Sequence, residues 1–590
     1  MGKLRIKLNW YIIVFAALIC ISIILRVILA YNDWPYFDSD EGTLALMAHN
    51  ILAYGEHPLV YYGQDYMGTI EAYLGAFFYS FLGGSVFAFR LGMVVLYGGF
   101  LLSSYFIARQ LYTKNFGLFI MALFSFGSTA VLSRQLAGIG GYMESDFAAA
   151  LAFAVALRLA LRTADVSGKE RMIRHFYFFL WSAAVGIGVW SDTIILPWVA
   201  CAGLLLVLFC WREMLFKGAI FSWLAGFLVG GFPLIDYNLT AARGHDSISV
   251  LLRFFGHTPF SLPIFLTQME NTLRVSLPIA SGDPVCHLND EDAIQHTTLH
   301  FYGFENGWGS HCAIFGYTWS TCFVALIAIS VVIGLIYLCR TLLTWRRNHQ
   351  LTFEEYQTLV RSCAHLILLI GVTGVILSFM RSVQALGMIG VFARYLLGIW
   401  IGLAAVLWPL WMGATKLKER TSRLLHRVDV VRCACCLTSL VIILLICIYG
   451  SVSALTQIPA ARTSEQLELQ SAQTLRDNGV THAYGYYWLC YRLAFYSNED
   501  LTCSNTLYDT KKQRLGYSHN RYLPYQYAVQ KDLYASYIVQ DGDTRSAQYI
   551  EKSLKKQHVR YITFRLADGN TVYKPLDPVK HLIIASYVSA

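Results

Sequence analysis

The sequence has few charged residues for its length. Only 14% of its 590 residues are Asp, Glu, Lys or Arg, whereas 56% are hydrophobic. A soluble globular protein usually carries about 25% charged residues. The composition therefore excludes an ordinary soluble protein and is typical of a polytopic α-helical membrane protein.

Signals of several other protein classes are also missing. No glycine-rich phosphate loop occurs, which argues against nucleotide binding, and no internal repeat of the kind found in many transporters is visible. The net charge of +9 is concentrated in loops predicted to face the cytoplasm, so it reports membrane topology and not nucleic-acid binding. No small-residue cleavage site precedes Asn32, so the first apolar run is expected to remain as a signal anchor.

Eleven apolar runs are candidate membrane spans. They cover residues 10–30, 86–108, 116–136, 147–161, 176–190, 193–211, 219–235, 321–338, 363–380, 395–411 and 437–453. If Met1 is cytoplasmic, the Lys and Arg residues of the short loops also fall on the cytoplasmic side. The expected location is therefore the cytoplasmic (inner) membrane, with a transmembrane domain over residues 1–453.

This orientation places three segments outside the cytoplasm. They are a first loop at 32–85, a long loop at 236–320 and a C-terminal tail at 454–590. The apolar segment 68–82 is predicted to lie in the membrane interface, because counting it as a span would invert every later loop.

The tail is predicted to form a soluble α/β domain. Residues 464–477 and 543–557 have helical patterns, and 481–487, 535–540 and 559–566 alternate as strands, whereas 507–527 has no clear period. Two disulfides, Cys286 to Cys312 in the long loop and Cys490 to Cys503 in the tail, are expected if the compartment is oxidising.

The first loop carries seven acidic residues and no Lys or Arg. Asp38, Asp40 and Glu41 directly precede a helical pattern that ends near Gly55. We therefore expect them at a helix N-terminus, where unpaired amides and the helix dipole favour negative charge. This position suits Asp40 to accept a proton or to hold a cation.

A second acidic helix start is predicted on the same face of the membrane. Glu144 and Asp146 begin the run at 147–161, so two carboxylate groups would meet at one outer surface. Ordinary helix capping is the alternative for either residue alone. A divalent cation held by Asp40 and Glu144 is an alternative to direct proton acceptance by Asp40.

Arginines near the outer ends of the spans complement these acids. A cation at that depth is disfavoured without an anionic partner. The partner could be a loop carboxylate or the phosphate of a lipid, which Arg binds bidentately. Arg394, followed by Tyr395, is the preferred phosphate contact, and Arg134 and Arg90 are further candidates.

The first loop resembles that of the GT-C fold glycosyltransferases. The features that match are Asp40-Glu41 soon after the first span, a helix closing at 55–58, and the motif YGQDYMG at 62–68 before an interfacial helix. The resemblance is to the branch of the protein O-mannosyltransferases and lipid A aminoarabinose transferases, and it is best over residues 10–165. It implies inverting transfer of a sugar from a polyprenyl-phosphate donor to a glycan, lipid or protein acceptor at the outer face.

The resemblance also implies roles for particular residues. Asp40 would be the catalytic carboxylate, with Glu41 as its neighbour and Glu144 or Asp146 as the second acidic site. Candidate contacts to the sugar or acceptor are Tyr62, Asp65, Tyr66 and Glu71. The aminoarabinose transferases have Glu-Lys-Pro before the interfacial helix, where this chain has Gly-Thr-Ile at 68–70, so another cation must hold the phosphate.

Two other function classes are compatible with a multi-span protein. A lipid or sugar transporter (flippase) would also contain ionisable residues in the membrane, but usually near its midplane. A surface receptor would leave the acidic first loop without a role. The crowding of charge at the outer boundary favours the enzyme.

Overall fold

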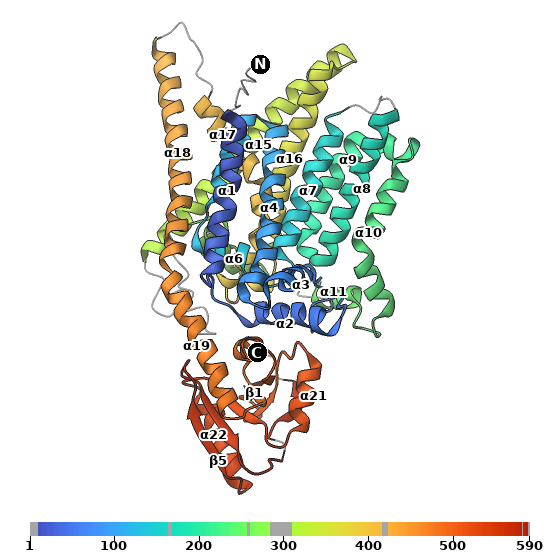
Figure 1. The fold of residues 1–590 in the computed structure, drawn as a ribbon. Helices are drawn as coiled ribbons and strands as arrows, with labels where there is room; N and C mark the ends of the chain where they lie inside the picture. Colours follow the sequence, from blue (N-terminus) through green and yellow to red (C-terminus); the bar gives the residue numbers. More distant parts are fainter. Residues whose placement is uncertain are drawn as a thin grey trace, which may run out of the picture.

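The computed structural model describes residues 10–162, 168–255, 260–283, 310–415, 423–580 and 582–587. It contains a bundle of long helices, with a smaller domain built around a seven-stranded sheet at one end (Figure 1). The predicted disulfide between Cys286 and Cys312 falls outside the described residues.

Eight helices of the described chain are long and apolar enough to cross a membrane. They lie in α1 (Trp10–Tyr31), α4 (Val86–Leu111), α8 (Gly168–Ser191), α9 (Leu196–Phe216), α10 (Ala219–Thr240), α15 (Ser310–Asn348), α16 (Phe353–Met380) and α18 (Arg423–Thr456). The helices α5 (Lys114–Ser125) and α6 (Thr129–Leu136) are together apolar enough for a further span, but they meet at a bend of 86°, as in a broken span or a re-entrant loop. The shorter α7 (Tyr142–Ala160) and α17 (Ile399–Thr415) pack within the same bundle. The eleven predicted runs are thus all helical, and the predicted fold class is confirmed.

A buried arginine stabilises the bend between α5 and α6. Arg26 of α1 donates to the backbone oxygens of Phe124 at 3.3 Å and Ser125 at 3.2 Å, and to Gln135 Oε1 at 2.6 Å. The two carbonyls lie at the end of α5, where they have no partner within the helix and where the dipole attracts a cation. Arg26 therefore pairs with a helix terminus, and not with the carboxylate or phosphate expected from the sequence.

The first loop forms two helices that lie across the end of the bundle, next to the C-terminal domain (Figure 1). They are α2 (Ser39–Tyr54) and α3 (Ile70–Leu82). Asp38 caps α2 by accepting a hydrogen bond from the Glu41 amide, and Gly55 ends the helix with a left-handed φ of 65°. The long loop contributes α11 (Ser247–Phe255), α12 (Leu262–Asn271), η2 (Thr272–Ser276) and α13 (Leu277–Ser281).

The C-terminal domain follows α19 (Ile458–Asp477). Its sheet has the order β5-β6-β4-β1-β2-β3-β7. The strands are β1 (His482–Gly485), β2 (Thr502–Asp509), β3 (Arg514–Tyr517), β4 (Ser536–Val539), β5 (Tyr561–Arg565), β6 (Thr571–Pro575) and β7 (Ile584–Tyr587), and the helices are α20 (Tyr487–Tyr496), α21 (Leu523–Lys531) and α22 (Thr544–Lys556). Because β6 runs antiparallel between β4 and β5, the two strands that α22 connects are parallel but do not pair with each other.

The C-terminal domain docks on the first loop through α20 and α2. A Cβ atom at Gly42 of α2 would lie 3.1 Å from the carbonyl carbon of Tyr491 in α20, so the two helices approach closely only because this residue is glycine. The predicted disulfide between Cys490 and Cys503 is confirmed, and it joins α20 to β2. The start of α2 is therefore held against a covalently braced part of the domain.

Candidate active site between the bundle and the C-terminal domain

Asp40 lies in the first turn of α2 and faces the C-terminal domain. Its Oδ1 accepts a hydrogen bond from the hydroxyl of Tyr487, and Arg521 Nη2 lies 3.4 Å from the same oxygen. Tyr61 donates to the backbone oxygen of Asp40 at 3.1 Å. No hydrogen bond joins Asp40 Oδ2 to a residue of the described chain. Two residues of the C-terminal domain thus contact one of the two carboxylate oxygens.

Arg521 lies between aromatic rings beside Asp40. Its guanidinium carbon is 5.3 Å from the ring centres of both Tyr61 and Tyr487, and its Nε donates to the Tyr487 hydroxyl at 3.1 Å. With its amide oxygen turned toward the guanidinium, Gln64 accepts from Nη1 at 2.6 Å and from Nη2 at 2.7 Å. These aromatic faces and acceptors hold a cation next to Asp40.

Arg394 approaches the same site from the bundle. It lies in η5 (Val391–Leu396), with its guanidinium carbon 5.3 Å from the Tyr142 ring and 5.8 Å from the Tyr395 ring. Its buried Nε has no hydrogen-bond partner in the described chain, and it is within electrostatic range of Asp40. An unsatisfied guanidinium donor in aromatic surroundings is suited to bind an anion.

Tyr66 and Asp192 complete this cluster. Tyr66 interacts electrostatically with Arg394, with Arg521 and with Asp192. Asp192 caps η1 (Thr193–Ile195) by accepting from the Ile194 amide at 3.0 Å. Burial raises the pKa of Asp192 to about 6.

Glu41 and Arg90 take no part in this cluster, which corrects the roles inferred from the sequence. Arg90 donates to both carboxylate oxygens of Glu41, at 2.9 and 2.7 Å, and both side chains are 0% exposed. Glu41 also accepts from the Gly138 amide at 3.3 Å. Arg90 therefore offers no open face to a phosphate, and Glu41 is a buried ion-pair partner.

Glu144 faces Glu71 and not Asp40. The two carboxyl groups are within hydrogen-bonding range, and Gly140 and Gly141 donate backbone amides to Glu71 and Glu144. Burial, followed by the Glu144 charge, raises the pKa of Glu71 well above its usual value. Glu71 is only 2% exposed and Glu144 only 1%, so the two carboxyl groups are buried against each other. The sugar contact at Glu71 and the second acidic site at Glu144 stay predictions.

A divalent cation at Asp40 and Glu144 does not fit these partners. Asp40 is bound to a hydroxyl and a guanidinium, and Glu144 is bound to another carboxyl group. Within the described ranges, no group of three or more His, Cys, Asp or Glu side chains is arranged to hold a metal ion.

Arg134 and Asp146 are brought together in the bundle. Both line a small cavity, with Gln135, Met143 and Trp400 among its other walls. Arg134 is also within electrostatic range of Asp38, at the cap of α2.

Tyr62 and Asp65 connect the first loop to its neighbours. Tyr62 donates to Glu56 and stacks on Tyr522 of the C-terminal domain, with ring centres 4.5 Å apart. Asp65 accepts from the Tyr237 hydroxyl at 2.8 Å and pairs with His245 at 3.0 Å. Of the four predicted sugar or acceptor contacts, Tyr66 alone lies in the cluster around Asp40.

Sequence reasoning missed the contribution of the C-terminal domain. Arg521 and Tyr487 flank Asp40, although more than 440 residues separate each of them from it. Arg521 falls in the Tyr-rich segment 507–527, which has no clear period, and no spacing or motif links it to the first loop. Only the docking of α20 on α2 brings these residues together. The position that matches the expected lysine is Thr69, which is fully buried and donates to Pro58 O at 2.9 Å.

Comparison with solved structures finds similar architectures that cover nearly the whole chain. ArnT from Cupriavidus metallidurans, solved with undecaprenyl phosphate bound, is 13% identical, with 96% of this chain and 98% of ArnT covered and a TM-score of 0.49. The oligosaccharyltransferase AglB from Archaeoglobus fulgidus, solved with an inhibitory peptide and a dolichol-phosphate, is 13% identical, with 96% and 74% covered and a TM-score of 0.46. No family model and no curated protein match the chain. ArnT is a lipid A aminoarabinose transferase, the group that the first loop resembles in sequence.

Proposed function

We propose that this protein is an inverting glycosyltransferase that moves a sugar from a polyprenyl-phosphate donor to an acceptor hydroxyl. The observation that carries the proposal is the meeting of Asp40 with Arg394 and Arg521 at the end of a membrane bundle. A transferase of this type needs a base for the acceptor and positive charge for the departing phosphate. The cluster contains both.

The reaction is a single displacement at the anomeric carbon of the sugar. The acceptor oxygen forms a bond to this carbon while the bond from the carbon to the phosphate oxygen breaks. The acceptor proton passes to Oδ2 of Asp40, and the bonding electron pair leaves with the polyprenyl phosphate. Attack opposite the leaving group inverts the configuration and needs no covalent sugar intermediate.

The proposed location is the extracytoplasmic side of the cytoplasmic membrane, with the N-terminus in the cytoplasm. Two observations support it. The cations of the short loops follow the positive-inside rule in this orientation. The disulfide between Cys490 and Cys503 is of a kind that persists in oxidising compartments. The site would then lie at the level of the outer lipid headgroups, where a lipid phosphate resides.

Mass analysis of cells with and without the gene tests the proposal. Glycolipids, glycans and glycoproteins of the deletion strain should lack one sugar, and the wild-type gene should restore it. Asp500→Asn, which changes an exposed carboxylate of the same chain, is the control variant and should also restore it. An unchanged set of glycans in the deletion strain would refute the function.

A further inference from the structure

The cation in contact with Asp40 belongs to the C-terminal domain and not to the membrane bundle. Arg521 Nη2 is 3.4 Å from Asp40 Oδ1. Arg394 of the bundle reaches Asp40 only through longer-range electrostatics, and Arg90 is occupied by Glu41. The smaller domain therefore completes the cluster.

The contact between Arg521 and Asp40 differs from the structural ion pairs of this protein. Arg90 binds Glu41 through two hydrogen bonds of 2.9 and 2.7 Å, with both side chains 0% exposed. Arg521 meets one oxygen of Asp40 at 3.4 Å, and the two side chains are 15% and 10% exposed. The contact of Arg521 with Asp40 is thus longer than the hydrogen bonds of the buried pair and involves a single oxygen. Arg521 binds Gln64 of the first loop more closely, at 2.6 and 2.7 Å.

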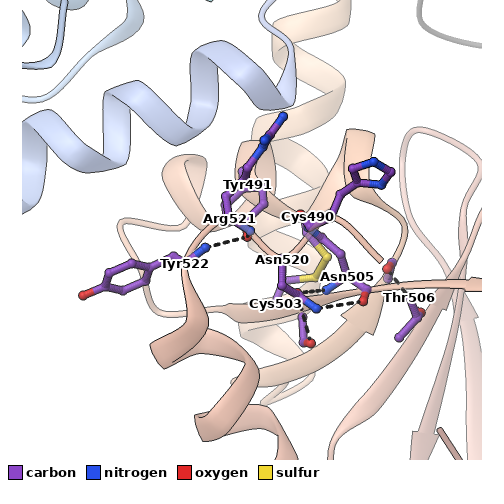
Figure 2. The surroundings of a disulfide bond; sticks show 11 residues. Cys490, Tyr491, Cys503, Asn505, Thr506, Asn520, Arg521 and Tyr522 are labelled. Atoms are coloured by element: carbon purple, nitrogen blue, oxygen red, sulfur yellow. Dashed lines mark hydrogen bonds between the residues drawn. A yellow bond between two sulfur atoms is a disulfide. The ribbon is translucent and has the colours of Figure 1, made fainter. Parts of the chain in front are cut away.

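The loop that carries Arg521 is nevertheless held firmly in position (Figure 2). Asn520 Oδ1 accepts from the Asn505 amide at 2.7 Å, and Asn520 Nδ2 donates to Asn505 O at 3.3 Å. On the other side, the Tyr491 hydroxyl accepts from the amides of Arg521 at 2.6 Å and Tyr522 at 3.1 Å. The backbone on both sides of Arg521 is thus fixed by buried polar contacts.

The two elements that fix this loop are themselves joined. Cys490 lies next to Tyr491 in α20 and Cys503 lies two residues before Asn505 in β2, so the disulfide ties together both anchors (Figure 2). From the bundle side, Gly63 packs on the loop, and a Cβ atom there would lie 3.0 Å from Arg521 Cα. The backbone of Arg521 is fixed on both sides, and its guanidinium group lies 3.4 Å from a single oxygen of Asp40. An arginine held in this way is positioned in advance to bind an anionic ligand.

We propose that Arg521 binds the donor phosphate together with Arg394, which makes the C-terminal domain part of the donor site. This inference rests on the proposed function. Gln64 contacts both Arg521 and, at 3.3 Å, the Tyr66 hydroxyl, and Tyr66 interacts electrostatically with both guanidinium groups. A phosphate beside Tyr66 would therefore be attracted by both arginines. A phosphate oxygen is a charged acceptor that replaces the oxygens of Gln64 and Asp40 as partners of Arg521.

Donor binding would also change the contacts of Asp40. Tyr487 and Arg521 both meet its Oδ1. When Arg521 turns to the phosphate, Tyr487 remains on this oxygen and the guanidinium charge moves to the leaving group.

Equilibrium binding of undecaprenyl phosphate to purified protein in nanodiscs tests the proposal, with undecaprenol as the neutral probe. Arg521→Gln should weaken undecaprenyl phosphate binding about tenfold or more, because it removes a charge-assisted contact. Arg521→Lys should recover part of this loss. Arg514→Gln removes the same charge from an exposed site on β3 of the same domain and should bind as the wild type does. Undecaprenol binding should be equal in all variants.

The outcomes distinguish failure of the role of Arg521 from failure of the proposed function. If the wild type prefers undecaprenyl phosphate over undecaprenol and Arg521→Gln keeps that preference, the role of Arg521 is refuted and the proposed function stands. If the wild type shows no preference, the donor class itself is refuted.

Chemical modification of the wild type gives a second measurement that does not depend on the folding of a variant. Undecaprenyl phosphate should protect Arg521 from phenylglyoxal, as read by mass spectrometry, whereas undecaprenol should not. Arg514 should react equally with either lipid present. Equal labelling of Arg521 with both lipids would overturn the inference.

Discussion

The substitution Glu41→Gln separates a structural role of this residue from a catalytic one. Both side chains of the Glu41 and Arg90 pair are 0% exposed, and the pair has two hydrogen bonds of 2.9 and 2.7 Å. Removing one partner of a buried pair leaves an uncompensated charge and costs about 3–5 kcal/mol. Glutamine can still accept one hydrogen bond from Arg90, so we expect a loss near the lower end of this range.

Thermal unfolding of the detergent-solubilised protein measures this cost, and the glycan product in cells, corrected for the amount of folded protein, measures function. The double variant Glu41→Met with Arg90→Met removes both charges and should regain most of the lost stability. Product per folded molecule should remain close to that of the wild type in both variants. A Glu41→Gln protein that is as stable as the wild type but makes no product would refute the structural role.

Three further predictions concern the surroundings of Asp40. Gly63→Ala should weaken binding of undecaprenyl phosphate, because Gly63 has a φ of 67° and an added Cβ atom would press on Arg521. Gly55→Ala is the control for backbone strain alone, since Gly55 has a φ of 65° but no atom within 4 Å of an added Cβ atom. The pKa of Asp192 is about 6 in the folded protein, above its ordinary value of 3.8. The folded state therefore binds this proton more tightly than the unfolded state does. The resulting contribution to the free energy of unfolding is complete below about pH 4 and is lost as the pH rises through 6. Asp192→Asn should therefore flatten the fall in unfolding temperature over that interval, and an unchanged pH profile would count against the raised pKa. Glu71→Gln should change the free energy of unfolding by no more than about 1 kcal/mol and keep the product, since an amide can donate to the carboxyl group of Glu144. Loss of product in a stable Glu71→Gln variant would support the role of Glu71 in sugar binding.

Much of the fold follows from local patterns in the sequence. The apolar runs predict the helices of the bundle, and the ends of α2 were readable because Asp38 and Gly55 are the residue types that cap a helix. The strands β2 and β3 escaped prediction, because β3 has only four residues and neither strand alternates clearly. The insertion of β6 between β4 and β5 depends on pairing between distant segments, which no local pattern encodes.

Only part of the candidate site could be predicted, because local patterns do not show which distant residues pack together. The position of Asp40 at a helix start is a local property, and it could be read from the residues around it. The position of an arginine near the end of a span also indicates that it needs an anionic partner. Which partner it meets depends on packing between distant segments. Arg90 therefore turned out to be paired with Glu41, and Arg521, from a domain distant in sequence, stands beside Asp40.

In the proposed mechanism, Asp40 takes the acceptor proton while the arginines hold the phosphate. Comparing Asp40→Asn with the wild type tests this mechanism through two quantities, binding of undecaprenyl phosphate by the purified protein and the glycan product in cells. We expect loss of the product with binding as tight as in the wild type or tighter, since asparagine is nearly isosteric with aspartate and releases Arg521. A product at wild-type level in cells that contain only Asp40→Asn would contradict it.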